Sequence, residues 1–126
     1  MNLHLGIKAE LELLVSPNET AAKYGSGSLE IFATPAMVAL MEKTCMICIA
    51  EFLDKGQNSV GVEINVKHSK ATPVSETVLC VAELVFIDRA KLTFDVKAYD
   101  QEGLIGHGTH KRFLIDEDQF RMKMNR

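Results

Sequence analysis

The feature that most constrains this sequence is a long, almost entirely apolar segment, Ala33–Gly56, with helix signals at both ends. Thr34 is a suitable N-cap, Pro35 fits the first helical position, and Gly56 is a common residue just past a helix end. A helix that is apolar around most of its circumference is usually buried on most sides. The sequence therefore predicts one central helix that the rest of the chain wraps around.

Three charged residues, Glu42, Lys43 and Glu51, interrupt this apolar segment. A membrane span needs about 20 consecutive apolar residues, so we do not expect the segment to cross a membrane. Glu42 lies in the middle of the predicted helix, where a buried carboxylate is costly unless it has a partner or a function. Glu42 is therefore a candidate functional residue.

Length and composition predict a soluble protein with one domain over residues 1–126. The net charge of −3 and the lack of a basic cluster in the sequence argue against nucleic acid or an anionic membrane surface as a partner. The N-terminus does not have the pattern of a signal peptide. The three cysteines lie in apolar segments, as buried free thiols do, so we expect a reducing, cytoplasmic location.

Hydrophobic alternation with a period of two predicts the strands around the helix. The first alternating segment covers residues 3–15, and a polar loop follows at Ser16–Ser28. After the helix, further β-prone segments cover residues 60–68, 76–87, 91–100 and 104–115. Short turns join the last three of these segments, which favours an antiparallel meander.

The strand that follows the helix carries a histidine on its predicted core side. Val60, Val62, Ile64 and Val66 alternate with glycine or polar residues, so we expect them to share the face that packs on the helix. His68 occupies the next even position and falls on the same face. The histidine is therefore predicted to lie near helix residues rather than in bulk water.

The predicted fold class is α+β, with an antiparallel β-sheet curled around one long central helix. Such a sheet has open edges, and pairing an edge strand with a second copy of the chain covers one of them. We therefore expect a homodimer, and a further dimer of dimers stays open.

Three strings in this chain, ATPAMVALME, VKHSKATPV and GHGTHKR, resemble the hotdog-fold thioesterases of the fluoroacetyl-CoA thioesterase-like group. The resemblance extends over nearly the whole chain and implies the hotdog fold. The catalytic set of that group is a threonine, a glutamate eight residues later and a histidine 26 residues after that, which Thr34, Glu42 and His68 match. The resemblance implies hydrolysis of an acyl-CoA thioester without a metal or a bound redox cofactor, with coenzyme A entering only as part of the substrate.

The residue types agree with this chemistry. Backbone N–H groups at a helix N-terminus stabilise a developing oxyanion, and Thr34 adds a hydroxyl there. Glu42 can act as a general base on water or attack the carbonyl, and His68 can orient a partner or pass on a proton. In a straight helix, however, Thr34 and Glu42 lie about 12 Å apart along the axis. The simplest solution is a site at a dimer interface, with Glu42 supplied by the second protomer.

Ser69, Lys70 and Arg112 are candidate substrate-binding residues. The Ser69 backbone N–H could hold the thioester carbonyl, and Lys70, Lys111 and Arg112 could hold the phosphates of coenzyme A at a cleft mouth. Ordinary solvated surface charge is the alternative for the three cations. His107 and His110 do not predict a metal site, because residues three apart in a strand point to opposite faces.

The loop Tyr24–Leu29, YGSGSL, is small and flexible, whereas the fluoroacetyl-specific enzyme of the group has a hydrophobic lid. We therefore expect a short or medium acyl group that is not fluorinated. The alternative functions are a non-catalytic acyl-CoA-binding hotdog dimer, a hotdog hydratase or dehydratase, and a purely structural dimer. The hydratase chemistry usually pairs an Asp with a His near a helix start, and the sequence has no such pair there.

Overall fold

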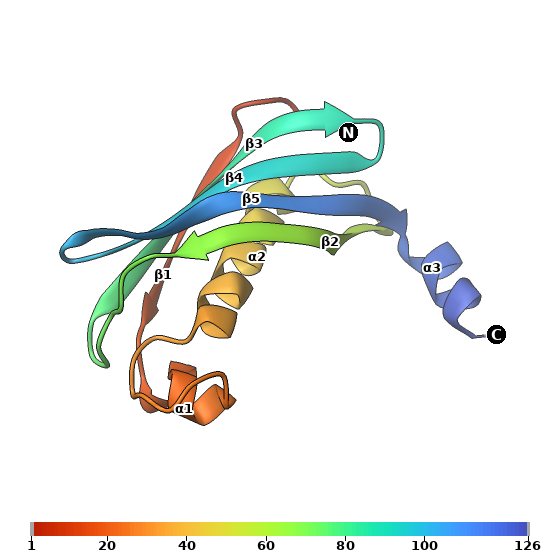
Figure 1. The fold of residues 1–126 in the computed structure, drawn as a ribbon. Helices are drawn as coiled ribbons and strands as arrows, with labels where there is room; N and C mark the ends of the chain where they lie inside the picture. The colour runs from red at the N-terminus through yellow and green to blue at the C-terminus, as the bar shows by residue number, and fades with distance from the viewer. Residues whose placement is uncertain (1, 126) are drawn as a thin grey trace.

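One five-stranded antiparallel sheet curves around a single long helix in the computed structural model, which describes residues 2–125 (Figure 1). The predicted domain of residues 1–126 includes Met1 and Arg126, which lie outside the described residues. The elements, in order, are β1 (Lys8–Leu14), a 3-10 turn (Pro17–Glu19), α1 (Ala21–Tyr24), α2 (Thr34–Ala50), β2 (Gln57–His68), β3 (Thr77–Asp88), β4 (Lys91–Asp100), β5 (Gly103–Asp116) and α3 (Glu117–Met124).

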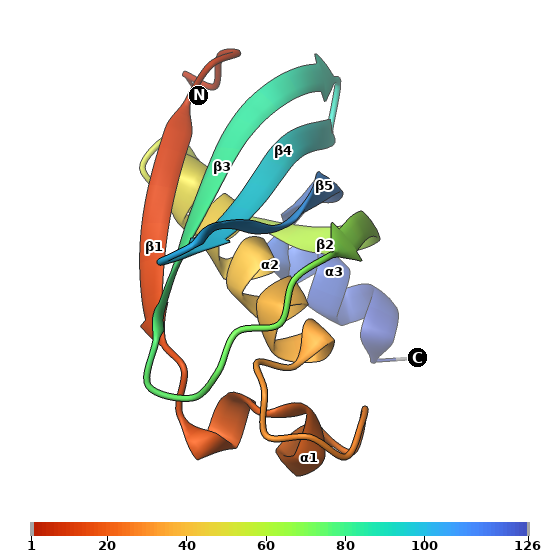
Figure 2. The same ribbon diagram turned by 60° about the vertical axis from the view of Figure 1, so that its left-hand side comes forward.

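The strand order is β1-β3-β4-β5-β2, so β1 and β2 form the two edges of the sheet. Figure 2 shows α2 lying in the hollow of the curved sheet, with α1 near its N-terminal end. The predicted alternation of β4 is confirmed, because the side chains that face α2 are all buried: Leu92, Phe94, Val96 and Ala98. The predicted meander of β3, β4 and β5 is also confirmed.

Helix α2 begins one residue before Pro35, its predicted first helical position, and ends well before Gly56. It begins at Thr34 with Ala33 as N-cap, so the prediction of Thr34 as the N-cap was wrong. The Thr34 hydroxyl is instead hydrogen-bonded to a side chain from β2. The helix ends at Ala50, and Gly56 with its positive φ of 82° belongs to the turn before β2. No helix within residues 2–125 is long and apolar enough to cross a membrane.

Helix α2 is also less buried than predicted. Its buried residues form one stripe that packs on the sheet: Ala36, Met37, Leu40, Met41, Thr44, Cys45, Cys48 and Ile49. On the opposite side, Met46 and Ile47 are 45% and 43% exposed. A single copy of the chain therefore covers only half of an apolar helix.

A β-bulge between Gly61 and Glu63 changes which residues of β2 face the helix. Gly61 faces α2, since a Cβ built on it would lie 2.9 Å from Oε2 of Glu42. Val62, predicted to face the helix, lies in the bulge and is 52% exposed, so the regular alternation predicted for this strand was wrong there. Beyond it, Val66 packs against the core as predicted.

Candidate active site

Thr34 and His68 meet at the N-terminus of α2. Thr34 is the first residue of this helix and His68 is the last residue of β2. The Thr34 Oγ1 and the His68 Nδ1 lie 2.8 Å apart, although the two residues are 34 positions apart in the sequence. The Phe32 ring and the imidazole pack in a T-shaped arrangement. The predicted position of His68 against helix residues is therefore confirmed.

The two side chains line a cavity of about 460 Å³. Small residues of the segment Ser26–Leu29 form part of its wall, together with Phe32. The cavity lies at the positive end of the α2 dipole, and no side chain of residues 2–125 caps that helix end. The first turn of α2 is therefore suited to bind a carbonyl oxygen that gains negative charge.

His68 is prepared to accept a proton. Burial lowers the pKa of His68 below its ordinary value of 6.5, and the backbone of Lys70 has a smaller, opposite effect. The imidazole is therefore neutral near pH 7. Its Nε2 atom is buried and has no hydrogen-bond partner within residues 2–125. A neutral histidine that is hydrogen-bonded through one ring nitrogen only can take a proton from the Thr34 hydroxyl or from a bound water.

Glu42 does not join Thr34 and His68 within one chain. Its carboxylate lies 4.0 Å from Nε2 of His110, beside Gly61. These residues line a second cavity of about 210 Å³, together with Ile64 of β2. The Glu42 side chain is 41% exposed. The desolvation cost of a fully buried carboxylate, which its position in the sequence predicted, is therefore not paid in full.

A buried polar cluster lies beside Glu42. Nδ1 of His110 donates to the Glu63 carbonyl at 2.8 Å, and Nε2 then accepts from Nη1 of Arg112 at 3.0 Å. Arg112 also donates from Nε and Nη2 to the hydroxyl and the carbonyl of Ser59. Sequence reasoning missed this cluster. The alternation of β5 was the available signal, because it places His110 and Arg112 on one face.

The predicted substrate-binding residues have other partners. Arg112 is only 5% exposed, so its prediction as a cation at a cleft mouth was wrong. The Ser69 N–H donates to the Ile105 carbonyl at 2.8 Å, so it is not available to a substrate in this conformation. Lys70 lines the 460 Å³ cavity, but its ammonium group pairs with Asp100 and Glu102. Lys111 pairs with Glu63 at 3.5 Å.

Comparisons with known proteins agree with the sequence resemblance. A family model described as "Fluoroacetyl-CoA-specific thioesterase" matches residues 15–118. The fluoroacetyl-CoA thioesterase of Streptantibioticus cattleyicolor is 41% identical over 95 residues, which is 75% of this chain and 68% of that protein. A solved structure of the fluoroacetyl-CoA thioesterase FlK has a TM-score of 0.92 at 34% identity, covering 99% of this chain and 97% of that chain.

Other solved structures extend this likeness. A variant of FlK with a threonine replaced by serine was solved in complex with acetyl-CoA, and it has a TM-score of 0.92 at 33% identity, covering 98% of this chain and 97% of that chain. A thioesterase superfamily member from Thermus thermophilus has a TM-score of 0.91 at 24% identity, covering 98% of this chain and 92% of that chain. The structural relatives confirm the predicted α+β hotdog fold.

Proposed function

Because this chain belongs to the fluoroacetyl-CoA-specific thioesterase family, it is a thioester hydrolase that acts on acyl-CoA, and we propose that Thr34, His68 and Glu42 carry the reaction. The observation that supports this assignment is the 2.8 Å contact between Thr34 and His68 in a cavity at the start of α2. In the proposed complex, the thioester carbonyl points at the first turn of α2. The N–H groups of that turn stabilise the oxyanion. The Thr34 hydroxyl also does so in the tautomer in which it accepts from Nδ1–H of His68 and keeps its own proton for the oxyanion.

Glu42 is proposed to come from a second copy of the chain. Thr34 and Glu42 belong to one continuous helix, and eight residues of helix span about 12 Å. This distance is too long for both groups of one chain to contact the same carbon atom. Glu42 lies beside the open edge strand β2, in one cavity with Ile64, which is 38% exposed. Met46, one helical turn further along α2, is 45% exposed. A second copy docked there buries this apolar surface and brings Glu42 to the partner's cavity.

Within this dimer, Glu42 acts as the general base on water or as the nucleophile, and His68 transfers a proton. In the wall segment Ser26–Leu29, Ser26, Gly27 and Ser28 are small and Leu29 is aliphatic, so the aromatic residue of this wall is Phe32, from outside the segment. The cavity is therefore proposed to accept a short or medium acyl group without selecting a fluorinated one. Three buried free thiols, Cys45, Cys48 and Cys80, are consistent with the cytoplasmic location we propose.

A panel of acyl-CoAs of increasing chain length, read with a thiol-reactive dye, tests the activity and the acyl preference together. We expect release of free coenzyme A, and we expect Glu42→Gln to lower kcat by about 10²- to 10⁴-fold. Glu10→Gln is the control, because Glu10 is exposed on the distant edge strand β1. Binding of acyl-CoA without release of coenzyme A would instead indicate the non-catalytic alternative.

Subunit mixing tests whether two chains build one site. Thr34→Ala and Glu42→Gln chains are inactive alone in this proposal, but a mixed dimer contains one complete site. We therefore expect activity to return after subunit exchange, up to about half of the wild-type value per mixed dimer. Persistent inactivity, with exchange confirmed by mass spectrometry, would place all three groups in one chain.

A further inference from the structure

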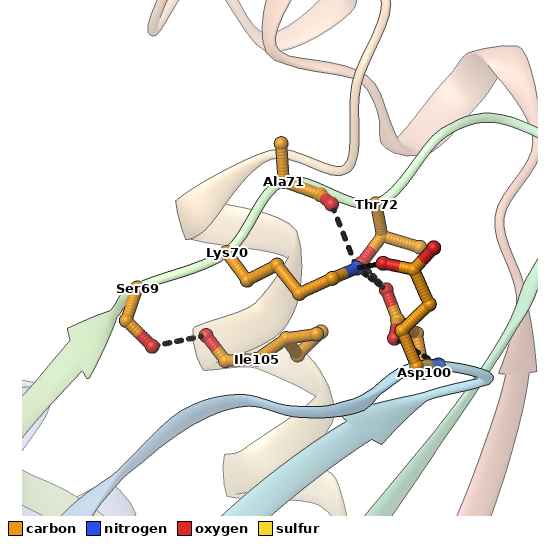
Figure 3. Close-up of polar contacts among 7 residues, drawn as sticks. Ser69, Lys70, Ala71, Thr72, Asp100 and Ile105 are labelled. Carbon is orange, nitrogen blue, oxygen red and sulfur yellow. Dashed lines mark hydrogen bonds and ion pairs between the residues drawn. The ribbon is translucent and has the colours of Figure 1, made fainter.

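The carboxylate of Asp100 is a fully buried acceptor at the end of β4, outside the set Thr34, His68 and Glu42 (Figure 3). Its Oδ2 accepts from the ammonium group of Lys70 at 2.5 Å and from the Thr72 hydroxyl at 2.8 Å. Its Oδ1 accepts from the Glu102 backbone N–H at 2.8 Å. Burial raises the pKa of Asp100, but the hydrogen bonds from Lys70, Glu102 and Thr72 outweigh it and hold the pKa below its usual range. Asp100 is therefore ionised at neutral pH.

The two donors from the segment after β2 connect Asp100 to both groups of the Thr34–His68 pair. Lys70 lies two residues after His68. The Thr72 carbonyl accepts from the Phe32 N–H at 2.8 Å, and Phe32 lies two residues before Thr34. The segment between β2 and β3 thus holds the chain that carries Thr34 on one side and the end of the strand that carries His68 on the other.

A second anchor fixes the same segment to β5. The Ser69 N–H donates to the Ile105 carbonyl at 2.8 Å, and the Lys70 N–H donates to the same carbonyl at 3.3 Å. These backbone bonds hold residues 69 and 70, whereas Thr72 is held by its side-chain bond to Asp100 and by its bond to Phe32. Asp100 therefore fixes the part of the segment, Thr72 and the following Pro73, that pairs with the chain entering α2.

We propose that Asp100 is a positioning residue for the hydrolysis. Through Lys70 and Thr72, Asp100 sets the distance between Thr34 and His68. The inference rests on the proposed function of that pair. Asp100 does not touch the substrate. It fixes two segments that approach each other only in the folded chain, and small displacements of catalytic groups reduce rates strongly.

Asp100→Asn tests the proposal, since an asparagine keeps the size of the side chain but loses its charge and one of its two acceptor oxygens. It can therefore not accept from Lys70 and Thr72 on one side and from the Glu102 N–H on the other. We expect kcat for acetyl-CoA, or for the best substrate of the panel, to fall about 10- to 100-fold while KM changes little. Asp95→Asn is the matched control, because Asp95 is an exposed aspartate in the same strand. We expect this control to leave kcat and KM unchanged.

The ring nitrogens of His68 give a readout that does not need turnover. We expect Asp100→Asn, and not Asp95→Asn, to change the ¹⁵N chemical shifts of His68, assigned with a His68→Asn variant. If the wild-type protein hydrolyses no acyl-CoA, the proposed function fails, but these shifts still decide whether Asp100 positions the pair. A folded Asp100→Asn variant with wild-type His68 shifts would overturn the inference, and so would altered shifts with an unchanged kcat.

If circular dichroism shows that Asp100→Asn does not fold, the variant Thr72→Val tests the same inference. Thr72→Val removes one hydrogen bond to Asp100 at a fully buried position and keeps the shape of the side chain. We expect the same change in the His68 shifts and a smaller fall in kcat. Wild-type shifts and a wild-type kcat in Thr72→Val would then overturn the inference.

Discussion

Two histidines near α2, His68 beside Thr34 and His110 beside Glu42, differ in how completely their ring nitrogens are hydrogen-bonded. His68 contacts Thr34 through one nitrogen, while its other nitrogen has no partner within the described residues 2–125. His110 uses both nitrogens, one toward the Glu63 carbonyl and one toward Arg112. A histidine bound on both sides is held in place, whereas one with an unengaged nitrogen beside a cavity can exchange a proton. We infer that the first region does chemistry and the second supports the fold around Glu42.

The largest effect expected is on catalysis at His68. His68→Asn removes the proton acceptor, so we expect kcat to fall about 10²- to 10⁴-fold, with a much smaller change in the free energy of unfolding. Steady-state kinetics and urea unfolding measure the two quantities. His107→Asn is the control, since His107 is exposed on the opposite face of the sheet. If His68→Asn kept the wild-type kcat, His68 would have no catalytic role to set it apart from His110.

The next largest effect is on stability at Arg112. Arg112→Met leaves buried acceptors on Ser59 and His110 without their donor, so we expect the free energy of unfolding to fall by about 3 kcal/mol. Lys111→Met, the neighbouring residue in a surface ion pair, is expected to change it by less than about 1 kcal/mol. Urea unfolding of both variants checks this difference. Equal losses would mean that the buried cluster does not stabilise the fold.

The smallest effect expected is the pH dependence of stability. Burial lowers the pKa of both His68 and His110 below 6.5 in the folded chain. Below that pH the unfolded chain binds more protons than the folded chain, so the free energy of unfolding falls as the pH decreases. We expect this fall in urea unfolding between about pH 7 and pH 5, with a shallower slope in His68→Asn than in His107→Asn. Stability that rises with decreasing pH would contradict the neutral state of both rings.

Several features of the fold could be predicted because their signals are local. The apolar segment that contains α2, the alternation of β4 and the even position of His68 are read from neighbouring residues, and the structure confirms them. The family spacing of Thr34, Glu42 and His68 added the candidate site residues. That spacing does not state which of these groups meet in one chain.

Other features depend on contacts between distant segments. The bulge at Gly61 turned Val62 outward, and no periodicity in the sequence indicated the extra residue. Arg112 was predicted to bind substrate phosphate at a cleft mouth, but Ser59 and His110 supply acceptors that let it be buried. Lys70 was predicted to contact phosphate, but its ammonium group is paired with Asp100 at the end of β4.

The sequence by itself determined which segments are helix and strand, and that a hydroxyl, an imidazole and a carboxylate stand at family spacings. Only the tertiary structure decided that Thr34 and His68 touch while Glu42 faces His110 instead. The physical reason is that periodicity records the local backbone and the side of each element, whereas hydrogen-bond partners are set by how strands pair and where a bulge shifts them. The same packing leaves half of α2 uncovered, and this exposed half supports our expectation of a second copy.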